Sequence, residues 1–128
     1  DAAVSIDWSA GERTQISGAL ARCPIESGRC AALARVVYQV AQPRDSETHG
    51  LLVLPVGAAR FVVPKHVPRP RWGSHTLVET MQHRVDALTG VEGTSTGSYL
   101  SEHWEYPECL RVTQIDVFSV DPGIEDAP

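Results

Sequence analysis

Three residues in this chain have the chemistry of a nucleophile, a base and a carboxylate that orients the base. Cys30 opens an apolar segment with helical spacing, so its sulfur should lie where the backbone N–H groups of a helix start favour negative charge. The thiolate is the nucleophilic form of cysteine, and helix starts are typical sites of reactive cysteines. Cys30 is therefore the candidate nucleophile, and its own N–H is a candidate donor to an oxyanion.

His75 follows a proline-rich loop and begins a segment with strand character. A base at the start of a strand can face a helix N-terminus across the boundary between two layers, as a thiol–imidazole pair requires. If the following hairpin turns around residues 80–81, antiparallel pairing sets residue 75 opposite residue 86, which is Asp. Directly opposed residues share a face of the sheet, with Cβ atoms about 4.5–5.5 Å apart. The sequence thus predicts a triad of Cys30, His75 and Asp86.

Two other interpretations compete with this triad. In the first, the thiols are buried and the domain is a non-catalytic interaction module that binds a protein through exposed Trp8, Trp72 and Trp104. In the second, a zinc enzyme uses His75 with other side chains, namely His83, His103 or Cys109. The chain has no C-x-x-C or C-x-x-H pair, so a structural zinc site has little support and no metal or cofactor is expected. The remaining histidines, His49 and His66, lie in predicted loops.

Composition places the chain among ordinary globular domains. With 128 residues and 42% hydrophobic residues, it fits one domain over residues 1–128, with 121–128 as a frayed tail. The net charge is −5 and no Lys/Arg-rich run is present, so neither DNA nor RNA is an expected partner. The apolar stretch 51–56 is far too short to span a bilayer, so no membrane is expected either.

The order of predicted elements gives the fold class. Helical spacing covers 8–22, with Ser9 or Thr14 as its cap, and the segment from Cys30 to just before Pro43. Short apolar or β-branched runs predict strands over 51–54 and 60–63, a hairpin over 75–86 and a last strand over 111–120, with a short helix over 99–104. Helices followed by several strands indicate an α+β fold, in which a helical layer packs on an antiparallel sheet.

The chain resembles a known family at three segments, which are Gly28-Arg29-Cys30-Ala31-Ala32, Gly73-Ser74-His75-Thr76-Leu77-Val78 and Arg84-Val85-Asp86. These resemble the papain-fold toxin domains of bacterial polymorphic toxins, over roughly residues 14 to 118. The resemblance implies a papain-like fold and a cysteine hydrolase that acts as protease, deamidase or acyl transferase. It also implies a secreted or delivered effector that modifies a protein in the cytoplasm of a target cell, with a cognate immunity protein as a second partner.

One position departs from the pattern of papain-like enzymes, which place a glutamine a few residues before the nucleophile to complete the oxyanion hole. The nearest upstream glutamine here is Gln15, on the preceding predicted helix, and residues 26–27 occupy the intervening loop. Gln15 is the candidate oxyanion donor if the path from helix to loop folds back. The alternative is the N–H of Cys30 together with a loop amide.

Overall fold

The computed structural model describes residues 5–25, 29–67 and 72–119 of the chain. The expected tail over 121–128 and the loop residues 26–28 and 68–71 lie outside the described part. In chain order the elements are α1 (Ala10–Arg22), α2 (Cys30–Ala41), β1 (His49–Pro55), β2 (His75–Thr80), β3 (His83–Val85), β4 (Thr94–Ser95), α3 (Tyr99–His103), the 3-10 turn η1 (Pro107–Cys109) and β5 (Leu110–Ile115).

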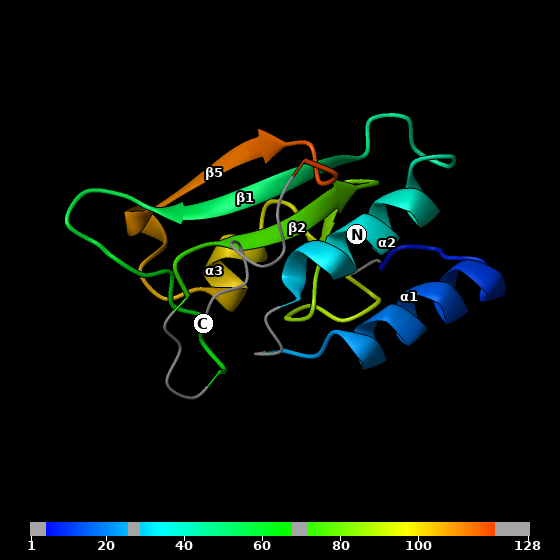
Figure 1. Ribbon diagram of the computed structural model, residues 1–128, viewed down its shortest axis with the longest axis horizontal. Helices are drawn as coiled ribbons and strands as arrows, with labels where there is room; N and C mark the ends of the chain where they lie inside the picture. The colour runs from blue at the N-terminus through cyan, green and yellow to red at the C-terminus, as the bar shows by residue number, and fades with distance from the viewer. Residues whose placement is uncertain (1–4, 26–28, 68–71, 120–128) are drawn as a thin grey trace.

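The strands form one antiparallel sheet of five strands in the order β4-β3-β2-β1-β5. The helices α1 and α2 lie together on one side of this sheet, with α2 next to β2, while α3 lies on the other side (Figure 1). The chain is thus an α+β domain with a helical layer on an antiparallel sheet, as its sequence predicts.

Local sequence explains both long helices. Ser9 caps α1 through a reciprocal capping box with Glu12, in which Glu12 N–H donates to Ser9 Oγ and Ser9 N–H donates to Glu12 Oε1. Thr14, the other predicted cap, lies inside the helix. In α2 the side chains of Leu33 and Val37 are buried against α1 and β2. Neither these helices nor α3 is long and apolar enough to cross a membrane.

Residues of β1 and β2 alternate between two differently covered faces of the sheet. On the helical face, Gly50 of β1 pairs with Val78 of β2, and Val78 packs under α2. On the opposite face, which we call the aromatic face, Val53 pairs with His75. The apolar cluster of that face consists of Leu51, Val53, Val62, Val67, Trp72, Leu77, Tyr99 and Trp104. Both faces of β2 are therefore buried.

The strand predicted over 60–63 does not form. This segment makes only isolated bridges, from Val62 to Trp72 and from Pro64 to Trp104. Proline has no N–H to continue a ladder, and the neighbouring backbone instead bonds to two other segments, with Val62 N–H donating to Trp72 O and Lys65 N–H to His103 O. The last strand, β5, is also shorter than predicted, because residues 117–119 form a turn and residue 120 lies outside the described part.

The hairpin between β2 and β3 turns one residue later than predicted. Its tip is Met81 and Gln82, both with positive φ, as in a two-residue type I′ turn. Val78 pairs with Val85 and Thr80 with His83, so the register is displaced by two residues from the predicted one. A shift of two residues keeps each side chain on its predicted face, since the side-chain period of a strand is two. His75 and Asp86 therefore remain on the same face, as diagonal rather than direct neighbours.

Candidate active site

Cys30, His75 and Asp86 come from three different elements and meet at one point. Cys30 is the first residue of α2, His75 is the first residue of β2, and Asp86 directly follows β3. His75 Nε2 lies 2.8 Å from Asp86 Oδ2. The imidazole also forms a hydrogen bond with Cys30. Because Nε2 contacts Asp86, Nδ1 is the ring nitrogen available for this second bond. The structure thus brings together the three residues that the sequence singles out.

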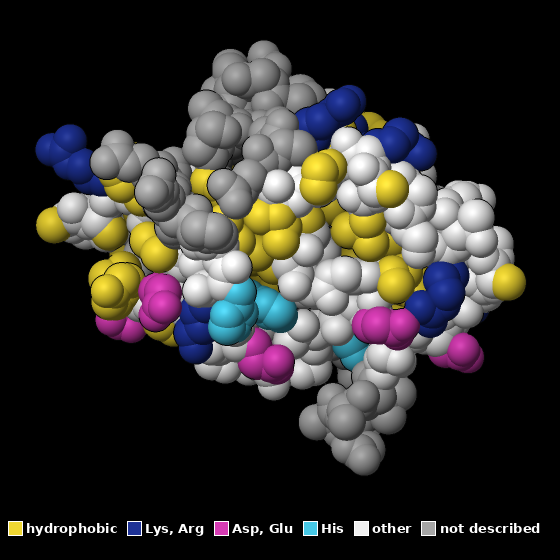
Figure 2. All heavy atoms as spheres, turned by 90° about the horizontal axis from the view of Figure 1, so that it is seen from below, with side chains coloured by type: hydrophobic (Ala, Val, Ile, Leu, Met, Phe, Trp, Pro, Cys, Tyr) yellow, Lys and Arg dark blue, Asp and Glu magenta, His cyan; other side chains and the backbone are white. Residues whose placement is uncertain are grey.

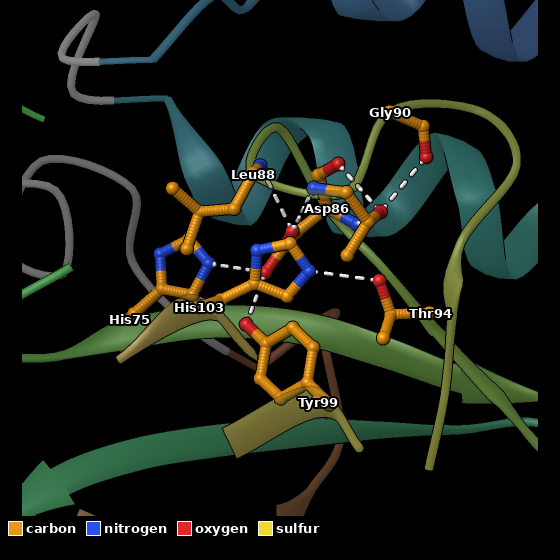
Figure 3. Close-up of polar contacts among 8 residues, drawn as sticks. His75, Asp86, Leu88, Gly90, Thr94, Tyr99 and His103 are labelled. Atoms are coloured by element: carbon orange, nitrogen blue, oxygen red, sulfur yellow. Dashed lines mark hydrogen bonds and ion pairs between the residues drawn. The ribbon is translucent and has the colours of Figure 1, made fainter. Parts of the chain in front are cut away.

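The carboxylate of Asp86 is fixed by the turn that follows β3. Its Oδ1 accepts hydrogen bonds from the backbone N–H groups of Leu88 at 2.9 Å and Thr89 at 3.0 Å (Figure 3). The hydroxyl of Thr89 bonds back to the turn, accepting from Asp86 N–H at 3.0 Å. An Asp followed three residues later by Thr is a sequence signal for such a turn, so Thr89 was detectable as a supporting residue.

Tyr99 is a further member of this site that the sequence does not reveal. Its side chain is fully buried on α3, and its hydroxyl donates to Asp86 Oδ2, the oxygen that also contacts His75 (Figure 3). Sequence spacing gives no hint of this contact, because Tyr99 reaches the carboxylate only through the path of the loop that contains β4.

Two tryptophans enclose the imidazole of His75. Trp72 stacks on the ring with centroids 5.3 Å apart and planes inclined by 18°, and Trp104 lies 5.4 Å away at 59°. The two indoles also contact each other edge to face. His75 is only 3% exposed and Asp86 2%, whereas Cys30 is half-buried. Of the three side chains, the thiol is therefore the one that solvent reaches, while the imidazole and the carboxylate are enclosed.

Electrostatics favour a charged pair in this enclosure. Burial of the imidazole opposes its protonation, but the hydrogen bonds and charges of Asp86 and Cys30 outweigh burial and raise the pKa of His75 to about 10. Burial likewise opposes the Asp86 carboxylate, yet the hydrogen bonds from His75, Tyr99 and the Thr89 backbone hold the pKa of Asp86 below its usual range. At neutral pH the arrangement is a carboxylate bonded to an imidazolium whose other N–H is directed to the thiol.

Gln15, the candidate oxyanion donor, is exposed on α1. That helix packs mainly on α2. The role of Gln15 stays a prediction, and the loop residues 26–27 lie outside the described part of the chain. At the start of α2, the first intrahelical N–H bond runs from Leu33 to Arg29, and the amides of Ala31 and Ala32 precede it.

Three of the other four histidines make local or structural contacts. His49 bonds to the carbonyl of Glu47 and His83 to that of Met81 through Nδ1, each at 2.8 Å. His103 bonds to Thr94 Oγ1 at 2.8 Å and so ties α3 to β4. Within residues 5–25, 29–67 and 72–119, no group of three or more His, Cys, Asp or Glu side chains is arranged to hold a metal ion.

The binding surface expected for the interaction module is not exposed. Trp8, Trp72 and Trp104, expected to be exposed, are at most 7% exposed. Trp8 packs in the core of the helical face, where its Nε1–H donates to Val91 O at 2.8 Å. The three cysteines, all within the described residues, form no disulfide, and Cys23 is buried in the same core.

Comparison of the chain with protein-family models, with curated proteins and with solved structures finds no match. The case for a function therefore depends on the geometry of the site.

Proposed function

We propose that this chain is a papain-like cysteine hydrolase or acyl-transfer domain in which Cys30, His75 and Asp86 are the nucleophile, base and orienting carboxylate. The observation that carries the proposal is the buried imidazole of His75, which is bonded to Asp86 on one side and to Cys30 on the other. A nucleophile, a base and a third group that orients the base are the shared elements of triad enzymes on unrelated folds.

The proposed reaction begins with attack of the Cys30 sulfur on the carbonyl carbon of a peptide bond or side-chain carboxamide. As the C–N bond breaks, the His75 imidazolium gives its proton to the nitrogen, which leaves as an amine or ammonia. Water then adds to the thioester carbon while His75 takes a proton from it, and the C–S bond breaks to release the acid and the thiol. An amine in place of water gives transamidation. Asp86 holds the ring in one orientation throughout.

The substrate we propose is a protein of a target cell, with this chain acting as a delivered toxin or effector in the target-cell cytoplasm and with an immunity protein as its second partner. The surface supports a protein as partner. On the face in Figure 2, hydrophobic side chains gather in the middle, while the Lys and Arg side chains of the described residues are separated from one another. A backbone-tracking nucleic-acid site would instead gather them into a stripe.

The decisive test of the proposed chemistry is alkylation of Cys30 by iodoacetamide across pH, followed by peptide mass spectrometry. Cys109 is the internal control, because it is a free, half-buried thiol outside the triad. An ordinary thiol reacts about tenfold faster per pH unit up to about pH 8.5, since only the thiolate reacts. We expect Cys30 to be already reactive at low pH, with a shallow profile. A Cys30 profile as steep as that of Cys109 would overturn the proposal.

The reaction type and the cellular role are tested by comparing cells that express the wild type with cells that express Cys30→Ala. We expect expression of the chain inside bacteria to arrest growth and expression of Cys30→Ala to leave growth normal. Mass spectrometry of the host proteins then separates the outcomes: new chain termini indicate proteolysis, replacement of glutamine by glutamate indicates deamidation, and isopeptide links indicate transfer. Arrest by both forms alike would contradict a cysteine-dependent toxin.

A further inference from the structure

The Asp86 carboxylate accepts four hydrogen bonds from described residues. The donors to one oxygen are backbone groups, and the donors to the other are side chains. Oδ1 accepts two backbone N–H groups, whose positions are set by the turn after β3. Oδ2 accepts His75 Nε2 and the hydroxyl of Tyr99. The oxygen that stabilises the charged imidazole is therefore shared with a second donor. A shared acceptor offers less negative charge to each partner than an acceptor with one donor.

Tyr99 is held so that its hydroxyl donates to Asp86. Its ring is fully buried at the first position of α3, and the guanidinium of Arg84 lies 5.5 Å from the ring centroid. Arg84 in turn pairs with Glu79 at 3.0 Å. Burial and the adjacent carboxylate raise the pKa of Tyr99 well above its ordinary value of 10. The phenol thus keeps its proton at neutral pH.

We infer that Tyr99 is a positioning residue of the site: through the oxygen it shares with His75, it orients Asp86 and moderates how strongly Asp86 retains the charged form of His75. This inference rests on the proposed function. A general acid must release its proton during the reaction, so an imidazolium bound too tightly by an unshared carboxylate is a poor proton donor to the leaving nitrogen. Tyr99 weakens the Asp86–His75 interaction enough that the imidazolium can both stabilise a thiolate and give up its proton.

The titratable and charged groups that contact this carboxylate or its two side-chain partners come from four elements, so the test must isolate one contact. They are Cys30 of α2, His75 of β2, Arg84 of β3, and Tyr99 and His103 of α3. Because the thiol and the imidazole titrate together, we use Cys30→Ala as the background, in which His75 is paired with Asp86 alone. The measurement is titration of the His75 ring by NMR in the full-length chain.

In this background we expect Tyr99→Phe to raise the pKa of His75 by roughly 0.5–1 unit, because Oδ2 is left to His75 alone. Tyr38→Phe is the matched control: it removes a phenol hydroxyl from α2 at a side chain that packs on Phe118, and should leave the titration unchanged. With Asp86→Asn also present, Tyr99→Phe should have no effect, because its action passes through that carboxylate. An unchanged or lowered His75 titration in Tyr99→Phe would overturn the inference.

A second variant decides the question if Tyr99→Phe does not fold. In a chain with Tyr38→Phe and Tyr106→Phe, incorporation of 3-fluorotyrosine alters Tyr99 alone. Fluorine makes the phenol a stronger donor with almost no change of shape, so the pKa of His75 should fall. No shift, or a rise, would contradict the inference. Failure of the proposed function is a separate result: Cys30 would then show the steep alkylation profile of Cys109 in the wild-type chain, whatever Tyr99 does.

Discussion

The two faces of the sheet are built by different means. The helical face is an aliphatic core in which α1 and α2 pack on Val78 and Val85 with residues at helical spacing. Among the described residues, no long helix covers the aromatic face. It is covered by α3, by the segment around Val62 and by Trp72 and Trp104, and it encloses a buried ion pair.

Because of this difference, we expect substitutions on the helical face to change mainly stability and substitutions on the aromatic face to change mainly reactivity. Apolar packing on the helical face is non-directional, so a substitution there should change the free energy of unfolding and leave the triad geometry in place. On the aromatic face each polar atom of His75, Asp86 and Tyr99 has a particular partner. Loss of one such partner leaves a buried group unsatisfied and changes reactivity directly. Substitutions on each face test this division.

The largest effect should come from Cys30, where the two faces meet. We expect Cys30→Ala to abolish substrate turnover and growth arrest, while the urea unfolding midpoint stays near that of the wild type, because alanine is the best helix former. The matched controls are Cys109→Ser and Cys23→Ala, which should retain activity. Full activity of Cys30→Ala would exclude a cysteine nucleophile at this position, and loss of activity in a folded Cys109→Ser would point to a different thiol.

Asp86→Asn should produce the next largest effect. The amide keeps the shape of the side chain but removes the charge that stabilises the imidazolium and can favour the wrong ring tautomer. We expect turnover and the rate of Cys30 alkylation at about pH 6 to fall by about 10- to 1,000-fold, less than in a serine triad because a thiol is intrinsically more acidic. Asp7→Asn, which removes one exposed carboxylate outside the site, is the control. Equal alkylation rates across about pH 5–9 would leave at most a Cys–His dyad.

The helical face was largely predictable from the sequence, because its signals are local. The capping residue Ser9, the helix start at Cys30 and the stop before Pro43 are all read from adjacent residues. The hairpin register was not, since Met81 and Gln82 carry none of the glycine or asparagine signals of a type I′ turn. Their positive φ angles are supported by tertiary contacts instead, including Met81 N–H to Asp45 Oδ2 at 2.7 Å.

The aromatic face could be predicted only in part. His75 and Asp86 were placed together because a two-residue shift in register does not change which face they occupy. The enclosure around them was missed: Trp72 and Trp104 entered only the interaction-module interpretation, as exposed side chains, and the segment around Val62 was expected to form a strand. These positions depend on where loops return to the sheet, which is set by long-range packing and leaves no periodic signal.

The charged pair also predicts how stability depends on pH. The pKa of His75 is about 10 in the folded chain and near 6.5 when unfolded, so its stabilising contribution is complete below about pH 6.5 and is lost as pH rises towards 10. The pKa of Asp86 is lowered, so its contribution is present above its unfolded value of 3.8 and is lost as pH falls through its folded value.

This dependence is measured by urea unfolding of the wild type and Asp86→Asn at several pH values. We expect the difference in unfolding free energy between the two proteins to decrease steadily from about pH 6.5 towards pH 10, because only the wild type holds an extra proton on His75. Other groups that titrate in this range are common to both proteins and cancel. Parallel curves for the two proteins would contradict a charged His75–Asp86 pair.

The smallest effects should come from glycines on the helical side. We expect a glycine-to-alanine substitution to lower the free energy of unfolding at one of them and to raise it at another. A Cβ on Gly50 of β1 would overlap Val117 Cγ1 and approach the carbonyl of Ile115 at 3.0 Å, so Gly50→Ala forces this part of the core apart. A Cβ on Gly11 in the first turn of α1 meets nothing within 4 Å, and alanine there reduces the entropy of the unfolded chain.

We therefore expect Gly50→Ala to lower the free energy of unfolding by about 1–3 kcal/mol and Gly11→Ala to raise it by up to about 1 kcal/mol. Urea unfolding measures both, and iodoacetamide reaction of Cys30 measures whether the triad is disturbed. In both variants the alkylation profile should match the wild type, because neither position contacts His75 or Asp86 and packing on the helical face adjusts without moving the ion pair. A destabilised Gly50→Ala with a steep, ordinary thiol profile would show that the two faces are coupled, and that the division between stability and chemistry does not hold.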